Sequence, residues 1–103
     1  MPEMPDELDL FIAVHSGLNR RRVARLFRRL GWEVRKSGWA EYEMRSAIAE
    51  LEVQAESPVL LHGTARDLDA VECVVASLRE GGAVFTGECY GEAGKLLREY
   101  KSG

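Results

Sequence analysis

Hydrophobic and polar residues alternate without interruption from position 49 to position 56. The apolar side of this alternation is Ala49, Leu51, Val53 and Ala55, and the polar side is Glu50, Glu52, Gln54 and Glu56. Successive side chains of a strand point to opposite faces, so this period of two predicts a half-buried β-strand. Ser57-Pro58 is typical of a turn, and the apolar residues 59–61 predict a second strand. Together they indicate a hairpin whose apolar face must be covered.

Two further strands are predicted at 8–15 and 83–90. The first has an apolar side, formed by Leu8, Leu10, Ile12 and Val14, and a mixed side, formed by Asp9, Phe11, Ala13 and His15. We expect the apolar side to lie under the helices, because it is the more hydrophobic one. The mixed side would then remain uncovered.

Three helices are predicted. The first begins after Asn19, whose side chain suits the N-cap position, and ends at Gly31. The second follows Thr64 and Asp67, which have the spacing of a capping box. The third is expected at 92–100, with its apolar residues Leu96, Leu97 and Tyr100 facing inward.

The region between residues 32 and 48 allows two interpretations. Residues 32–36 and 39–44 can form two short strands around a turn at 37–38. A helix over 39–55 is the alternative, since Met44, Ile48, Leu51 and Ala55 also fall at helical intervals. The strict alternation of 49–56 favours the strands.

The order of predicted elements indicates an α+β fold of the ferredoxin-like, split βαβ arrangement. In that arrangement an antiparallel sheet carries helices on one face. If 39–55 were helical, the fold would become an α/β layer instead. We expect residues 1–7 to be a flexible tail and residues 8–103 to form one α+β domain.

The composition indicates where the protein resides more clearly than which chemistry it performs. The 103 residues carry a net charge of −3 and include only two cysteines, Cys73 and Cys89, outside any metal-binding spacing. No apolar run approaches the length of about 20 residues that spans a bilayer, and the acidic start lacks a signal-peptide pattern. We therefore expect a cytoplasmic protein that has no membrane association, metal or cofactor.

Charge is strongly segregated along the chain. Residues 20–36 carry eight positive charges against Glu33 alone, a net of +7, which leaves −10 for the remainder. Arg22, Arg25 and Arg29 share one side of the first predicted helix and form a candidate interaction surface. Nucleic acid is a disfavoured partner, because the sequence pI is about 5.4 and no stacking aromatic lies among these arginines.

The uncovered sheet face is the second candidate interaction surface. Phe11 and His15 project from the first strand, and Glu50 and Glu52 project from the hairpin. An aromatic residue among charges on an open sheet is a plausible docking or dimerisation surface.

A small-molecule site is the alternative. Its candidate residues are Trp32, Trp39, Tyr42 and His62. His15 and His62, with Glu50, are the natural candidates for acid–base catalysis, but their spacing matches no catalytic or metal-ligand motif.

The sequence thus predicts a non-enzymatic protein-interaction domain. It would act as an inhibitor or immunity-type partner, or as a self-associating module such as a homodimer. A small-molecule sensor is the alternative function, ahead of an enzyme or a nucleic-acid binder.

Overall fold

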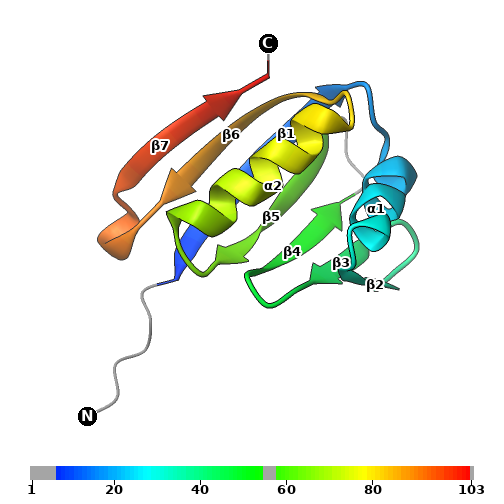
Figure 1. The fold of residues 1–103 in the computed structure, drawn as a ribbon, viewed down its shortest axis with the longest axis horizontal. Coiled ribbons are helices and arrows are strands. Elements are labelled where there is room, and N and C mark those ends of the chain that lie inside the picture. The colour runs from blue at the N-terminus through cyan, green and yellow to red at the C-terminus, as the bar shows by residue number, and fades with distance from the viewer. Residues whose placement is uncertain (1–6, 55–57, 103) are drawn as a thin grey trace.

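The computed structural model describes residues 7–54 and 58–102, which contain one seven-stranded antiparallel sheet. The strands lie side by side in the order β2-β3-β4-β5-β1-β6-β7 (Figure 1). The first strand of the chain is therefore central, with β5 on one side and β6 on the other. The strand bounds are β1 (Leu8–Ser16), β2 (Glu33–Lys36), β3 (Tyr42–Arg45), β4 (Ala49–Gln54), β5 (Val59–Ala65), β6 (Val84–Tyr90) and β7 (Leu96–Lys101).

Two helices, α1 (Arg20–Arg29) and α2 (Leu68–Glu80), cover one face of this sheet (Figure 1). The alternating apolar residues of the strands point toward the helices and are buried with them in one core. Phe27 from α1, Leu78 from α2 and Leu10 from β1 are each fully buried there. The other face of the sheet remains open, as the alternation of β1 predicted.

The helix boundaries follow local hydrogen bonding. As predicted, Asn19 caps α1, and its side-chain oxygen accepts a hydrogen bond from the Arg22 amide at 2.9 Å. The cap of α2 is Asp67, which accepts from the Ala70 amide at 2.9 Å. The predicted capping role of Thr64 is wrong, because Thr64 still belongs to β5.

The strand interpretation of the region between α1 and β4 is confirmed. Strands β2, β3 and β4 pair as an antiparallel meander in which Met44 lies opposite Leu51. Met44 is only 1% exposed and belongs to the core that the sheet shares with the helices. The alternative helix over 39–55, and the α/β layer that depended on it, are wrong.

The third predicted helix is also wrong, because residues 96–101 form strand β7. A short 3-10 turn, η1 (Glu92–Gly94), reverses the chain after β6, and β7 then pairs with β6. The open edge of β6 offers backbone partners to this segment, whose apolar spacing suited either state. Arg98 of β7 also donates to Glu72 of α2 at 2.6 Å, which ties the new strand to the helix layer.

The predicted fold class is confirmed at the level of an α+β domain with an antiparallel sheet. The ferredoxin-like arrangement is not confirmed, because both the number and the order of the strands differ from it. Most of the tail predicted at 1–7, the end of the strand predicted at 49–56 and Ser57 of the predicted turn lie outside the described residues. Within the described ranges, neither helix is long and apolar enough to cross a membrane.

Candidate functional site

The open sheet face presents one row of side chains that crosses all seven strands. Residues paired directly across antiparallel strands point to the same face, so the register defines this row. From β2 to β7 it consists of Arg35, Glu43, Glu52, His62, Phe11, Glu88 and Glu99. An aromatic centre thus lies between carboxylates.

The aromatic centre consists of Phe11, His62 and Tyr90, with Phe11 in the middle. The Phe11 ring stacks on His62 with the centroids 6.2 Å apart and the planes 13° from parallel. Tyr90 meets it edge to face, with the centroids 5.9 Å apart and the planes at 76°. Despite both contacts the Phe11 side chain is 49% exposed, which leaves ring surface for another molecule.

Carboxylates hold both ends of the aromatic centre in place. Glu52 lies 3.0 Å from the Nε2 atom of His62 and also accepts from the Gln54 amide at 3.3 Å. On the other side, the Tyr90 hydroxyl donates to Glu88 at 2.8 Å. This hydrogen bond to Glu88 raises the pKa of Tyr90, because the bond is lost when the phenol ionises.

A groove of about 810 Å³ runs along the aromatic centre on the open face. Leu60 and Ala13 contribute apolar surface to it, and Thr86, Glu99 and Lys101 contribute polar groups. Its walls come from β4, β5, β1, β6 and β7, so no single hairpin forms it.

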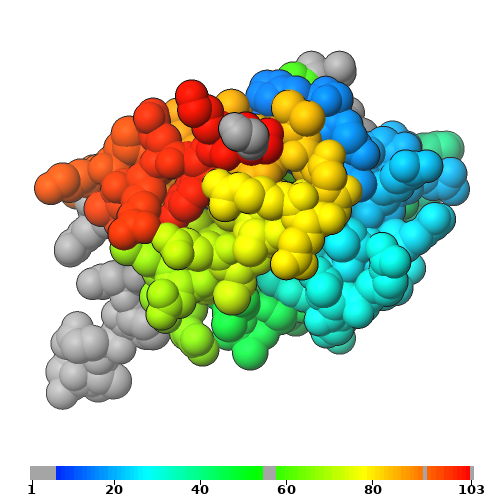
Figure 2. Space-filling model, turned by 45° about the horizontal axis from the view of Figure 1, so that its top comes forward, coloured from blue at the N-terminus to red at the C-terminus, as the bar shows by residue number. Residues whose placement is uncertain are grey.

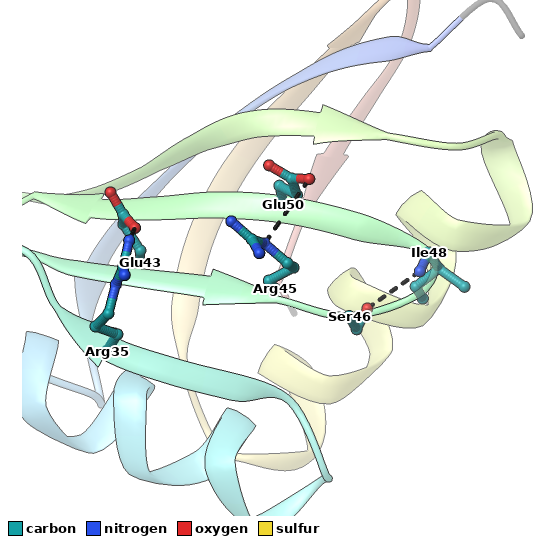
Figure 3. A network of polar contacts seen from close by, with 6 residues as sticks. All are labelled: Arg35, Glu43, Arg45, Ser46, Ile48 and Glu50. Carbon is teal, nitrogen blue, oxygen red and sulfur yellow. Dashed lines mark hydrogen bonds and ion pairs between the residues drawn. The ribbon is translucent and has the colours of Figure 1, made fainter.

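Ion pairs are concentrated at one end of the open face. At the β2 end, Arg35 contacts Glu43 at 2.6 Å and Arg45 lies 3.9 Å from Glu50 (Figure 3). The hydrogen bond to Glu43 raises the pKa of Arg35 further. Among the described residues, no lysine or arginine lies within 4 Å of three carboxylates nearer the β7 end, Asp9, Glu88 and Glu99.

The structure separates the two predicted interaction surfaces. Arg22, Arg25 and Arg29 are exposed on α1, which lies on the helix-covered side of the sheet (Figure 2). Phe11, on the open face, points away from them. The arginines and the aromatic centre therefore cannot form one continuous site within a single chain.

Of the other predicted open-face residues, Glu52 joins the aromatic centre, whereas His15 does not. His15 hydrogen-bonds Thr86 at 3.1 Å near the end of β1. His62 lies opposite Phe11, four residues away from His15, which corresponds to about 13 Å along a strand. The two histidines therefore form no pair, and Glu50 pairs with Arg45 rather than with either of them.

The predicted small-molecule residues are scattered. Trp32 packs edge to face on Phe27 at 5.0 Å, on the helix side of the sheet. Tyr42 is half-buried against the same core, and Trp39 is 95% exposed in the β2–β3 connection. Only His62 from that predicted set lines the groove.

Metal and thiol chemistry find little support in the described part of the chain. No group of three or more histidine, cysteine, aspartate or glutamate side chains there has metal-binding geometry. Cys73 is exposed on α2, whereas Cys89 is buried in β6, and burial raises the pKa of its thiol.

Sequence reasoning missed three members of the open-face site: Tyr90, Glu88 and Glu99, the last because residues 92–100 were predicted to be a helix. The alternation within β6 could have placed Tyr90 and Glu88 on the same face as each other. It could not place them beside Phe11, because that requires knowing that β6 pairs with β1.

Comparison with protein-family models, curated proteins and solved structures found no significant match to this chain.

Proposed function

We propose that this chain is a non-enzymatic protein-interaction domain whose open sheet face binds a basic, partly apolar surface of a partner. One observation carries the proposal: a half-exposed aromatic centre lies beside Asp9, Glu88 and Glu99, within 4 Å of which the described part of the chain places no lysine or arginine. Aromatic anchors bordered by polar groups are typical of protein interfaces. Inhibitor and immunity-type proteins act by occupying a partner's surface in this manner.

The chemistry of the open face favours binding over catalysis. Glu52 could orient His62, as a carboxylate does beside a general base. Among the described residues, however, the hydrogen bonds of His62 include no hydroxyl or thiol that it could activate. Instead, the Phe11 ring lies beside the imidazole and nearly parallel to it, with the centroids 6.2 Å apart.

The test is affinity capture from nuclease-treated lysate with matched variants of the open face. One variant removes the ring, Phe11→Ser, and a second removes two charges, Glu88→Gln with Glu99→Gln. The matched control, Glu33→Gln with Glu43→Gln, makes the same charge change at the β2 end of the same face. We expect both site variants to lose a salt-sensitive partner that the control retains. Identical retention by all variants would contradict the proposal.

A small-molecule-binding domain is the second candidate, favoured by the size of the groove. Its volume of about 810 Å³ is within the range of small-molecule sites. A ligand at 100 times its Kd would add about 2.7 kcal/mol to the free energy of unfolding, which a thermal-shift assay detects. A metabolite panel that shifts the wild-type Tm but not that of Phe11→Ser would support this candidate. Equal shifts in both proteins would place the ligand elsewhere.

A further inference from the structure

We infer that the occupant of the open face is the arginine-rich helix α1 of a second copy of this chain, so that copies join head to tail. The inference rests on the proposed function, because it names the partner of that same face. Two surfaces of opposite charge, one on each side of the molecule, carry it.

The first surface is the exposed side of α1. It consists of Arg21, Arg22, Arg25, Arg28 and Arg29, which are all exposed. Within the described chain none of them has a carboxylate within 4 Å, and Arg28 donates only to the Val34 carbonyl at 3.4 Å.

This helix repels itself. Arginines three and four residues apart face one another along it, and like charges at that spacing are destabilising. Its first turn contains no acidic residue to complement the positive end of the helix dipole. Carboxylates supplied by another molecule would relieve both effects.

The second surface is the part of the open face nearest β7. Glu88 and Glu99 lie directly opposite each other in the β6–β7 register, and Asp9 projects from the same face. Like charges opposed across two strands are destabilising. A guanidinium group would relieve this repulsion by bonding two carboxylates in its plane, and Phe11 beside them offers a ring face for a cation.

The spacing of the two surfaces is compatible. Arg22 and Arg25 are separated by about 4.5 Å along the helix axis, close to the roughly 4.8 Å between the strands of Glu88 and Glu99. Arg29 lies about 6 Å farther along the axis, which would place it near Phe11. Leu30, 50% exposed at the end of α1, would add an apolar contact.

Symmetric pairing is electrostatically disfavoured. Two open faces meeting about a two-fold axis would leave the arginines of α1 without carboxylates, and two α1 helices meeting would bring the arginines together. Opposite surfaces on opposite sides of one molecule instead give a heterologous contact. Such a contact leaves a free surface at each end, and extends into chains unless its rotation closes a ring.

The test is sedimentation velocity of the purified protein at low and high salt. The Debye length, over which exposed charges interact, shortens from about 30 Å at 10 mM to about 3 Å at 1 M ionic strength. We expect concentration-dependent association of the wild type near the lower value and monomers near the higher one. A helix variant, with Arg22, Arg25 and Arg29 changed to Gln, and the face variant Glu88→Gln with Glu99→Gln should each remain monomeric at low salt. Circular dichroism checks their folding.

Mixing the two variants provides the decisive measurement. The helix variant retains a normal face and the face variant retains a normal α1, so the mixture should form a one-to-one complex that cannot extend. A wild type that stays monomeric at low salt would overturn the inference, as would association that persists in either variant alone. If the wild type is monomeric but captures a lysate protein that the Phe11→Ser variant does not capture, the proposed function stands. Only the second copy is then excluded as the partner.

Discussion

Replacing Tyr100 with phenylalanine should stabilise the protein, although it removes a polar group. Tyr100 lies in β7 and packs against the core beside α2. Its hydroxyl oxygen is buried, and the described residues provide it with no hydrogen-bond partner. The nearby Arg98 guanidinium donates to Glu72 at 2.6 Å, and its interaction with the Tyr100 hydroxyl is weaker than the effect of burial on that group. Tyr100→Phe therefore deletes an unsatisfied group and keeps the packed ring.

The size of the effect follows from the desolvation of that hydroxyl. An unsatisfied buried polar group costs about 1–3 kcal/mol. Because the Tyr100 ring is only half-buried, we expect the lower end, a gain of about 1 kcal/mol. For a domain of this size that gain corresponds to a Tm increase of roughly 4–8 °C.

Urea unfolding followed by tryptophan fluorescence measures this gain, since Trp32 packs on buried Phe27 while Trp39 is already 95% exposed in the native state. The control is Tyr90→Phe, which loses the exposed hydrogen bond to Glu88 and should bring no gain. A Tyr100→Phe variant that is equal to or less stable than the wild type, at an unchanged m-value, would refute the reasoning. That result would mean that the hydroxyl is satisfied.

The same residue makes stability sensitive to alkaline pH. Burial raises the pKa of the Tyr100 phenol and Glu72 raises it further, while Arg98 partly offsets both. In the native state the Tyr100 phenol therefore stays protonated above pH ~10, which is the pKa of tyrosine in an unfolded chain. The contribution of the protonated phenol to the free energy of unfolding is complete below pH ~10 and is lost as the pH rises through the native pKa. The free energy of unfolding should thus fall more steeply above pH ~10 in the wild type than in Tyr100→Phe.

Three further predictions concern single sites. Gly63→Ala should lower the unfolding free energy by about 1–3 kcal/mol, more than Gly87→Ala. The reason is that the new Cβ would strike the Glu50 carbonyl oxygen and lie 2.9 Å from the Leu51 Cα. Equal losses of unfolding free energy for the two variants in urea would contradict this. Asn19→Ala should cost about 1 kcal/mol through the lost cap, whereas Asn19→Asp should cost nothing, and a similar loss for both would exclude capping as the cause. With a thiol reagent, Cys73 should react in the native state and Cys89 only in urea; two fast native thiols would show that β6 opens.

The sequence predicted those elements whose signals are local. Asn19 and Gly31 mark the ends of α1 by their own chemistry, and the alternation around Leu51 fixes which side of β4 is buried. Residues 96–100 were mispredicted because their apolar spacing suits a helix as well as a strand. The available edge of β6 decides between the two, and that edge lies outside the segment itself.

The candidate site was only partly predictable for a similar reason. Phe11 and Glu52 could be assigned to an uncovered face from alternation alone. His62 could not, because the apolar run before it is too short to define its parity. Tyr90 joins the aromatic centre only through the pairing of β6 with β1, which no local pattern encodes.

The central position of β1 also affects how the chain can be made. Strand β1 ends at Ser16, but its neighbours begin at Val59 and Val84. At a synthesis rate of roughly 5–20 residues per second, several seconds separate β1 from its first neighbour, and still longer from its second. The β2–β4 meander can close as soon as it leaves the ribosome, since its partners are consecutive. During that interval β1 has no sheet to join, so its apolar side stays accessible to other chains until β5 and then β6 have been made.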